Sequence, residues 1–131
     1  MRNVFISLLV IFILLSTTGC KKNPPPPKAE ENILISTDAG ALTYTPGPNF
    51  NFNLMVESAM PVAGVRITFD VKGETDNQVY RQGPAIETTN KTTRITITNL
   101  PRQKICVCTI TVTSKSKPTN TATTSFRVVY K

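Results

Sequence analysis

The sequence predicts an all-β domain: a single antiparallel β-sandwich of seven or eight strands that occupies residues 33–131. Three observations support this fold class. Apolar residues recur at every second position in several runs, which is the period of a half-buried strand. Turn-forming residues separate these runs at intervals of roughly 8 to 15 residues. No stretch shows the 3.6-residue period of an amphipathic helix.

The clearest strand is FNFNLMV, residues 50–56, where two phenylalanines, Leu54 and Val56 share one face and two asparagines the other. The same alternation occurs in VRITFDV (65–71), RITIT (94–98), CVCTITV (106–112) and SFRVVY (125–130), and shorter strands are predicted at 33–36, 41–44 and 78–82. Proline, glycine and asparagine mark turns at 45–48, 60–61, 73, 83–84, 99–101 and 117–120. This pattern is typical of sandwich architectures.

The N-terminus has a different composition. After Arg2, residues 4–15 are apolar except for Ser7. A membrane-spanning helix needs about 20 apolar residues, so this shorter run indicates the apolar region of a signal peptide. We therefore predict a signal peptide over residues 1–19.

Small residues lead to a cysteine at the end of this segment, in the order Ser16, Thr17, Thr18, Gly19, Cys20. This junction resembles the lipobox of bacterial lipoproteins, with Thr17 where that family usually has leucine. The resemblance implies cleavage between Gly19 and Cys20 and acyl chains such as palmitate on Cys20. Ordinary secretory cleavage nearby, which would leave Cys20 a free thiol, is the alternative.

By resemblance to lipoproteins of Gram-negative bacteria, Lys21 after the cysteine implies a lipid anchor in the outer membrane. The domain would face either the periplasm or the cell surface. Residues 20–32 hold the lipidated cysteine and a proline-rich linker whose composition does not pack. Pro24 to Pro27 favour polyproline II at about 3.1 Å per residue, so the linker can hold the domain on the order of 35 Å from its anchor.

A second resemblance concerns residues 95–131. This segment looks like the last three strands of an immunoglobulin-like or fibronectin type III domain, in which a Leu-Pro corner precedes a long strand and a hairpin. The chain has Ile105 or Cys106 where such domains often have a corner tyrosine, so Leu100 packing and Pro101 rigidity must hold the corner. The resemblance implies a module for binding, spacing or presentation.

The cysteine pair Cys106 and Cys108 is chemically the most interesting feature of the predicted core. At about 3.3 Å per residue, their Cα atoms lie about 6.6 Å apart on one face of a strand, at the outer limit for a disulfide. A thiolate metal site usually needs four ligands, and the chain has no histidine. We predict no metal or cofactor and favour two buried core residues, with a redox dithiol as the alternative.

Charge and residue types bound the function further. The chain carries a net charge of +7, but its basic residues are scattered singly, which favours a solvated surface over nucleic-acid binding. Without histidine, the common nucleophile and base pairs are absent. The carboxylates considered for catalysis lie in no recognisable motif, so no catalytic residue is predicted; they are Glu57, Asp70, Glu74, Asp76 and Glu87.

These observations predict a non-catalytic interaction or structural module of the bacterial envelope, with an envelope protein as its partner. The alternative is a glycan-binding module of a surface polysaccharide-handling system. Flat aromatic side chains usually form glycan platforms, and the chain has no tryptophan. Because Tyr44 and Tyr130 fall in strand alternations that packing explains, the candidate for this role is Tyr80.

Overall fold

The computed structural model of the protein describes residue 19 and residues 23–131. Within these residues the chain forms nine β-strands and no helix, so the all-β prediction is confirmed. No described segment is a helix that could cross a membrane. The strands are β1 (Ile35–Thr37), β2 (Leu42–Thr45), β3 (Phe50–Val56), β4 (Val65–Gly73), β5 (Val79–Tyr80), β6 (Ile86–Thr88), β7 (Thr92–Ile97), β8 (Ile105–Ser114) and β9 (Thr121–Tyr130).

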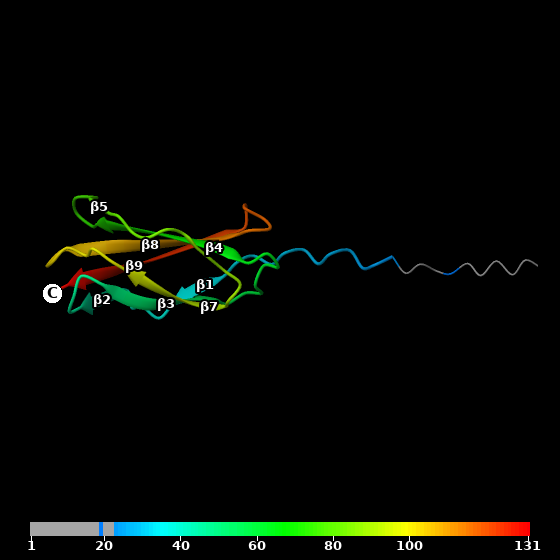
Figure 1. The fold of residues 1–131 in the computed structure, drawn as a ribbon, viewed down its shortest axis with the longest axis horizontal. Coiled ribbons are helices and arrows are strands. Elements are labelled where there is room, and N and C mark those ends of the chain that lie inside the picture. Colours follow the sequence, from blue (N-terminus) through cyan, green and yellow to red (C-terminus); the bar gives the residue numbers. More distant parts are fainter. Residues whose placement is uncertain (1–18, 20–22) are drawn as a thin grey trace, which may run out of the picture.

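The strands form two sheets that pack face to face as a β-sandwich (Figure 1). The smaller sheet has the order β1-β3-β7 and is antiparallel throughout. The larger sheet has the order β2-β9-β8-β4, and both β5 and β6 pair with the far side of β4. The linker leaves one end of the sandwich, and the C-terminus lies at the other end (Figure 1).

Two details differ from the predicted strands. The sequence indicated at most eight, and the ninth is β6, whose three residues are too few for an alternating pattern to be recognised. The prediction also made every pairing antiparallel, whereas β2 runs parallel to β9. Residues 38–41 carry the chain from one sheet to the other without a hairpin, so β2 is free to pair in the parallel direction.

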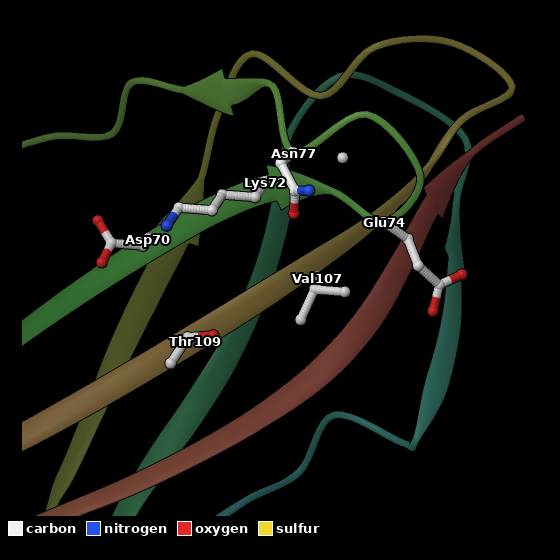
Figure 2. Close-up of a pocket in the computed structure, with 7 residues that line it drawn as sticks. Asp70, Lys72, Glu74, Asn77, Val107 and Thr109 are labelled. Atoms are coloured by element: carbon white, nitrogen blue, oxygen red, sulfur yellow. The ribbon is translucent and has the colours of Figure 1, made fainter.

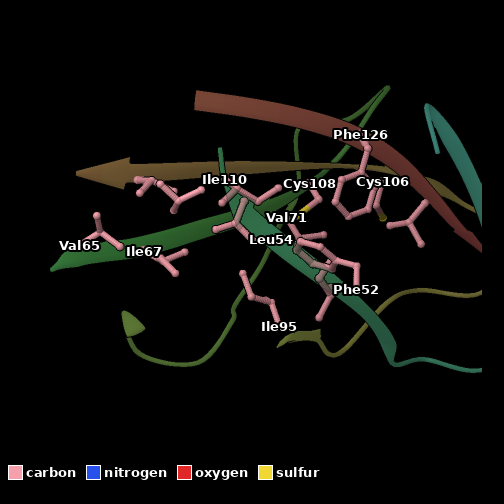
Figure 3. Packing of buried hydrophobic residues seen from close by; sticks show 14 of the residues in the cluster. Phe52, Leu54, Val65, Ile67, Val71, Ile95, Cys106, Cys108, Ile110 and Phe126 are labelled. Carbon is pink, nitrogen blue, oxygen red and sulfur yellow. The ribbon is translucent and has the colours of Figure 1, made fainter. Parts of the chain in front are cut away.

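The core lies between the two sheets and uses the predicted alternation. In β8, every second residue from Cys106 to Ser114 is buried. The ring of Phe52 on β3 meets that of Phe126 on β9 edge to face, with centroids 4.9 Å apart, and this contact joins the two sheets. The buried apolar residues are Ile33, Phe52, Leu54, Val56, Val65, Ile67, Val71, Ile95, Ile97, Leu100, Cys106, Cys108, Ile110, Val112, Phe126 and Val128 (Figure 3).

The corner before β8 is held as the sequence predicted for Leu100. Its side chain is buried in the core, and its N–H donates to the carbonyl oxygen of Pro48 at 3.0 Å. Asn99 precedes it with a φ of 61°, a left-handed conformation that asparagine tolerates better than most residues. The corner therefore needs no tyrosine hydroxyl.

The buried side chain of Asn120 fastens the end of the linker to the domain. Its Nδ2 donates to Glu30 Oε1 at 2.7 Å and to the carbonyl oxygen of Glu31 at 2.8 Å. Its Oδ1 accepts the N–H of Ile33 at 2.9 Å. Ser116 Oγ also donates to Glu30. Polar contacts with the domain thus begin at Glu30, inside the predicted linker of residues 20–32.

Candidate interaction surface

The outward face of the larger sheet is the broadest surface that the strands form together. Strand registers place residues on it in rows, because residues directly opposite each other point to the same side. Val129 of β9 lies opposite Tyr44 of β2 and Ile105 of β8. These three residues form one row. It lies where β2 and β9 end and β8 begins, at the end of the sandwich away from the linker (Figure 1).

A second row, which contains both apolar and charged residues, lies one step closer to the middle of the sheet. Arg127 of β9 lies opposite Leu42 of β2 and Val107 of β8, and Lys72 of β4 lies opposite Val107 and Val79. We define the distal patch as the apolar members of both rows: Leu42, Tyr44, Val79, Ile105, Val107 and Val129.

The distal patch exposes large apolar side chains to solvent. Tyr44 is 53% exposed, Val79 61%, Leu42 42% and Ile105 39%. Apolar side chains scattered singly over a surface need no explanation, but a cluster of them is typical of a site for protein contact. The clustering therefore makes the distal patch the candidate functional site.

Charged groups lie within the patch as well as beside it, because Arg127 stands between Leu42 and Val107 in the second row. Arg127 Nε lies 2.5 Å from Glu74 Oε1, and Lys104 Nζ lies 2.6 Å from Asp76 Oδ2. The hydrogen bond from Lys104 holds the pKa of Asp76 below its usual value, and the same bond raises the pKa of Lys104. Asp76 and Lys104 therefore stay charged near neutral pH, and the patch combines exposed apolar side chains with charged ones.

Lys131 covers part of the aromatic surface. Its Nζ lies 3.8 Å from the centroid of the Tyr44 ring, a distance typical of a cation–π contact. The ring is thereby held in place at the edge of the sheet.

A shallow hollow of about 290 Å³ lies beside the distal patch (Figure 2). Its floor comes from β8, and the end of β4 and the turn after it form its polar sides. It could take a small polar group of a partner that rests on the sheet. The lining residues are Asp70, Lys72, Gly73, Glu74, Asn77, Val107 and Thr109.

The half of the same face nearer the linker carries hydroxyl groups instead of apolar side chains. Thr111 lies opposite Thr123 with hydroxyl oxygens 3.4 Å apart, and Thr113 lies opposite Thr121 with a separation of 3.2 Å. These short side chains present a polar surface to solvent. The change from hydroxyl to apolar groups along one sheet restricts the candidate site to the distal end.

The sequence interpretation of two tyrosines is reversed by the structure. Tyr80 lies opposite the fully buried Val71, so its side chain points to the inner side of the sheet and packs against the core. Tyr44, which the sequence pattern assigns to strand packing, lies on the outward side of an edge strand and is exposed. Tyr80 is therefore not a flat platform on the outward face.

Cys106 and Cys108 are core residues. Both side chains are completely buried and both thiols are free. Burial raises the pKa of Cys108 to about 12 and also raises the pKa of Cys106. A thiol that stays protonated and buried is a poor nucleophile, which agrees with the structural interpretation of the pair.

Four of the five carboxylates considered for catalysis have partners on the surface. Glu74, Asp76 and Glu87 each form an ion pair with a lysine or arginine, and Glu57 accepts a hydrogen bond from Ser36. Asp70 lines the hollow beside the distal patch. These surface contacts give each of the four carboxylates a structural role.

The residues at the predicted lipidation site lie at the margin of the structure. Gly19 is exposed, and Cys20 lies outside the described residues, as do residues 1–18 of the predicted signal peptide.

No protein-family model matches the chain, and neither the curated proteins nor the solved structures contain a match.

Proposed function

We propose that this protein is a lipid-anchored lipoprotein of the bacterial outer membrane whose sandwich is a non-catalytic interaction module for an envelope protein. The observation that carries the proposal is the distal patch. Its exposed apolar side chains come from β2, β5 and the start of β8. These strand segments lie at the end of the domain opposite the linker (Figure 1). A domain tethered at residue 20 would present this end away from the membrane, where a partner can reach it.

The strand order supports an immunoglobulin-like assignment of the domain within this proposal. Constant-type domains of this kind place their first, second, fourth and fifth strands in one sheet and their third, sixth and seventh strands in the other. Here β1, β3 and β7 form one sheet and correspond to the first, second and fifth of those strands. In the other sheet β4, β8 and β9 lie side by side and correspond to the third, sixth and seventh. Folds of this kind serve many functions, so the function has to be argued from the distal patch itself.

Site-directed photo-crosslinking in cells tests the partner. A photoreactive residue at position 105, in the distal patch, should form one dominant adduct with an envelope protein. The matched control is position 62, because Val62 is a fully exposed apolar residue outside the patch and lines a different hollow together with linker residues. Equal adducts from both positions, or none from position 105, would contradict the proposal.

A substitution within the patch gives a second measurement. Leu42→Asp should abolish the adduct from position 105, because burying an unpaired carboxylate in a contact is strongly unfavourable. Val62→Asp should leave the adduct unchanged. An adduct that survives Leu42→Asp would place the contact elsewhere.

Glycan binding is the second candidate, and the exposed Tyr44 favours it. Since the ring of Tyr80 faces the core, Tyr44 would have to supply the flat aromatic surface, although Lys131 already contacts its ring. A glycan array probed with the domain decides this: saturable binding that Tyr44→Ala removes and Tyr80→Phe retains would favour a glycan-binding module over a protein-binding one.

A further inference from the structure

One edge of the smaller sheet is formed by β7, which is longer than the other edge strands of the described residues. It has six residues, whereas β1, β2, β5 and β6 have between two and four. It pairs with β3 on one side, and no strand of the described residues pairs with its other side. The unpaired backbone groups of such an edge are a template for an additional strand.

The hydrogen-bond pattern shows which backbone groups of β7 point outward. In an antiparallel ladder, residue pairs alternate between those that are hydrogen-bonded and those that are not. The N–H of Val56 donates to the carbonyl oxygen of Lys91 at 2.8 Å, at the pair that extends the β3–β7 register by one position. The odd-numbered residues of β7 therefore bond to β3, and Thr92, Arg94 and Thr96 direct their N–H and C=O groups away from it.

The next residue of this edge whose backbone groups point outward is Thr98, and the side chain of Gln82 already binds them. Its Nε2 donates to the carbonyl oxygen of Thr98 and its Oε1 accepts the N–H of Thr98, both at 2.9 Å. These are the two bonds that a peptide group of an added strand would make. Beyond Gln82 the chain turns to β4, where Ile86 lies opposite Ile67. The edge thus already binds a peptide-like amide at one end.

We propose that Thr92, Arg94 and Thr96 form a docking edge for an extended peptide segment of another protein, which adds to the sheet beside β7. Backbone hydrogen bonds would supply the affinity and alternate side chains the specificity, as in other cases of strand addition. This edge belongs to the smaller sheet, so the site is separate from the distal patch on the larger sheet.

The charge of the edge identifies the side chains that fit. Arg94 is exposed and takes part in none of the three ion pairs of the described residues. A residue directly opposite it would share its outward direction, and an acidic side chain there is favourable. The neighbouring residues of the added strand would point inward beside Ile95, where apolar side chains fit. The ligand is therefore an extended segment that alternates apolar and acidic residues and lacks proline.

A second copy of this chain fits the edge less well. The twofold arrangement that pairs all three outward residues puts Arg94 directly opposite its own copy, and like charges in that position are destabilising. A shift of the register either reduces the number of paired residues or requires Thr98, whose backbone groups are bonded to Gln82.

Amide hydrogen exchange of the full chain in detergent tests the proposal, with an acetylated and amidated peptide of alternating valine and glutamate as the probe. The N–H groups of Thr92, Arg94 and Thr96 should exchange at least about tenfold more slowly with saturating peptide, since they become hydrogen-bonded. Those of Thr93 and Ile95 should change little, because β3 already protects them. A peptide N-methylated on alternate residues should not bind.

Three outcomes would overturn the proposal. The first is no slowing at millimolar peptide, and the second is slowing confined to another part of the domain. The third is slowing at the same three residues when protein concentration is raised without peptide, because that would identify a second copy as the occupant.

A proline substitution tests the edge in a second way. Thr96→Pro removes an outward N–H without removing a bond to β3, which edge strands tolerate, and it should abolish peptide protection at Arg94. Thr96→Val is the matched control, since it also loses the hydroxyl bond to Asn51 but keeps the N–H and should bind. Arg94→Glu should reverse the preference toward a peptide of alternating valine and lysine. Full binding by Thr96→Pro would contradict the proposal.

Discussion

Asn120 Oδ1 accepts a hydrogen bond from the backbone N–H of Ile33 at 2.9 Å, between residues 87 positions apart in the sequence. The same side chain donates to Glu30 and to the backbone of Glu31. One buried amide thereby connects the turn between β8 and β9 to the end of the linker. The linker enters the domain at a fixed point instead of swinging from Ile33.

Asn120→Ala should destabilise the domain by about 1–3 kcal/mol. The substitution leaves the Ile33 N–H, the Glu30 carboxylate and the Glu31 carbonyl oxygen without the amide to which they are hydrogen-bonded. Urea unfolding of the variant and the parent chain measures this difference. Thr119→Ala, an exposed change in the same turn, should alter stability by less than about 0.5 kcal/mol. Equal effects of the two variants would show that the hydrogen bonds of Asn120 contribute little.

A segment of residues 30–131 should fold on its own and be more stable than one of residues 33–131. Both hold the whole core, and a sandwich of this size buries enough apolar surface to be stable alone. Thermal unfolding followed by circular dichroism should show a cooperative loss of a strand spectrum in each, with the longer segment melting higher. Identical melting temperatures would mean that residues 30–32 add nothing.

The contribution of Glu30 should depend on pH in a defined direction. The hydrogen bond from Ser116 holds the pKa of Glu30 below its usual value of 4.5. A carboxyl group with a lowered folded-state pKa contributes stability that is present above the unfolded value and is lost as pH falls through the folded value. The stability difference between the parent chain and Glu30→Gln should therefore be constant above about pH 5.5 and shrink below pH 4.5. A difference that grows on acidification would contradict this assignment.

Cys108→Ala should cost about 1–2 kcal/mol, because it leaves a modest cavity in the core. In the parent chain, labelling of Cys106 and Cys108 should be slow in the folded domain and fast on unfolding, as the raised pKa of both thiols and their complete burial require. Counting labelled thiols before and after denaturant measures this. Rapid labelling of the native protein would instead support a redox dithiol.

The mature chain should begin at Cys20 and carry acyl chains there. Mass spectrometry of the N-terminal peptide tests this prediction, and partition of the protein into detergent supplies an independent readout. A Cys20→Ala variant should accumulate as the uncut precursor. An unmodified N-terminal peptide from a protein that stays out of the detergent phase would refute the lipid anchor.

The fold could be predicted from the sequence where alternation is long. The apolar and polar positions of β4 and β8 follow one period across nine and ten residues, and this period predicts which side of each strand faces the core. Short elements carry too little pattern, so the sequence predicts no strand at β6 and extends β5 to residues 78–82. The parallel pairing of β2 depends on which sheet the chain crosses to, and local sequence does not encode that choice.

The candidate surface was harder to predict, because exposure depends on which strand lies at an edge and which side another sheet covers. Tyr44 and Tyr80 both sit in short strands, and their opposite orientations follow from pairing with β9 and β4 respectively. One signal was present in the sequence. Ile105, Cys106 and Val107 are consecutive apolar residues, so one face of β8 had to expose apolar side chains at its start.

The parallel pairing of β2 with β9 has a mechanical consequence. Pulling on the linker while the opposite end of the domain is held would load these two strands along their axes and in opposite directions. Their four residue pairs would then bear the load together, in shear, instead of separating one after another as a hairpin does when it is unzipped. The pairing of β2 with β9 would therefore be the contact that resists extension of the domain.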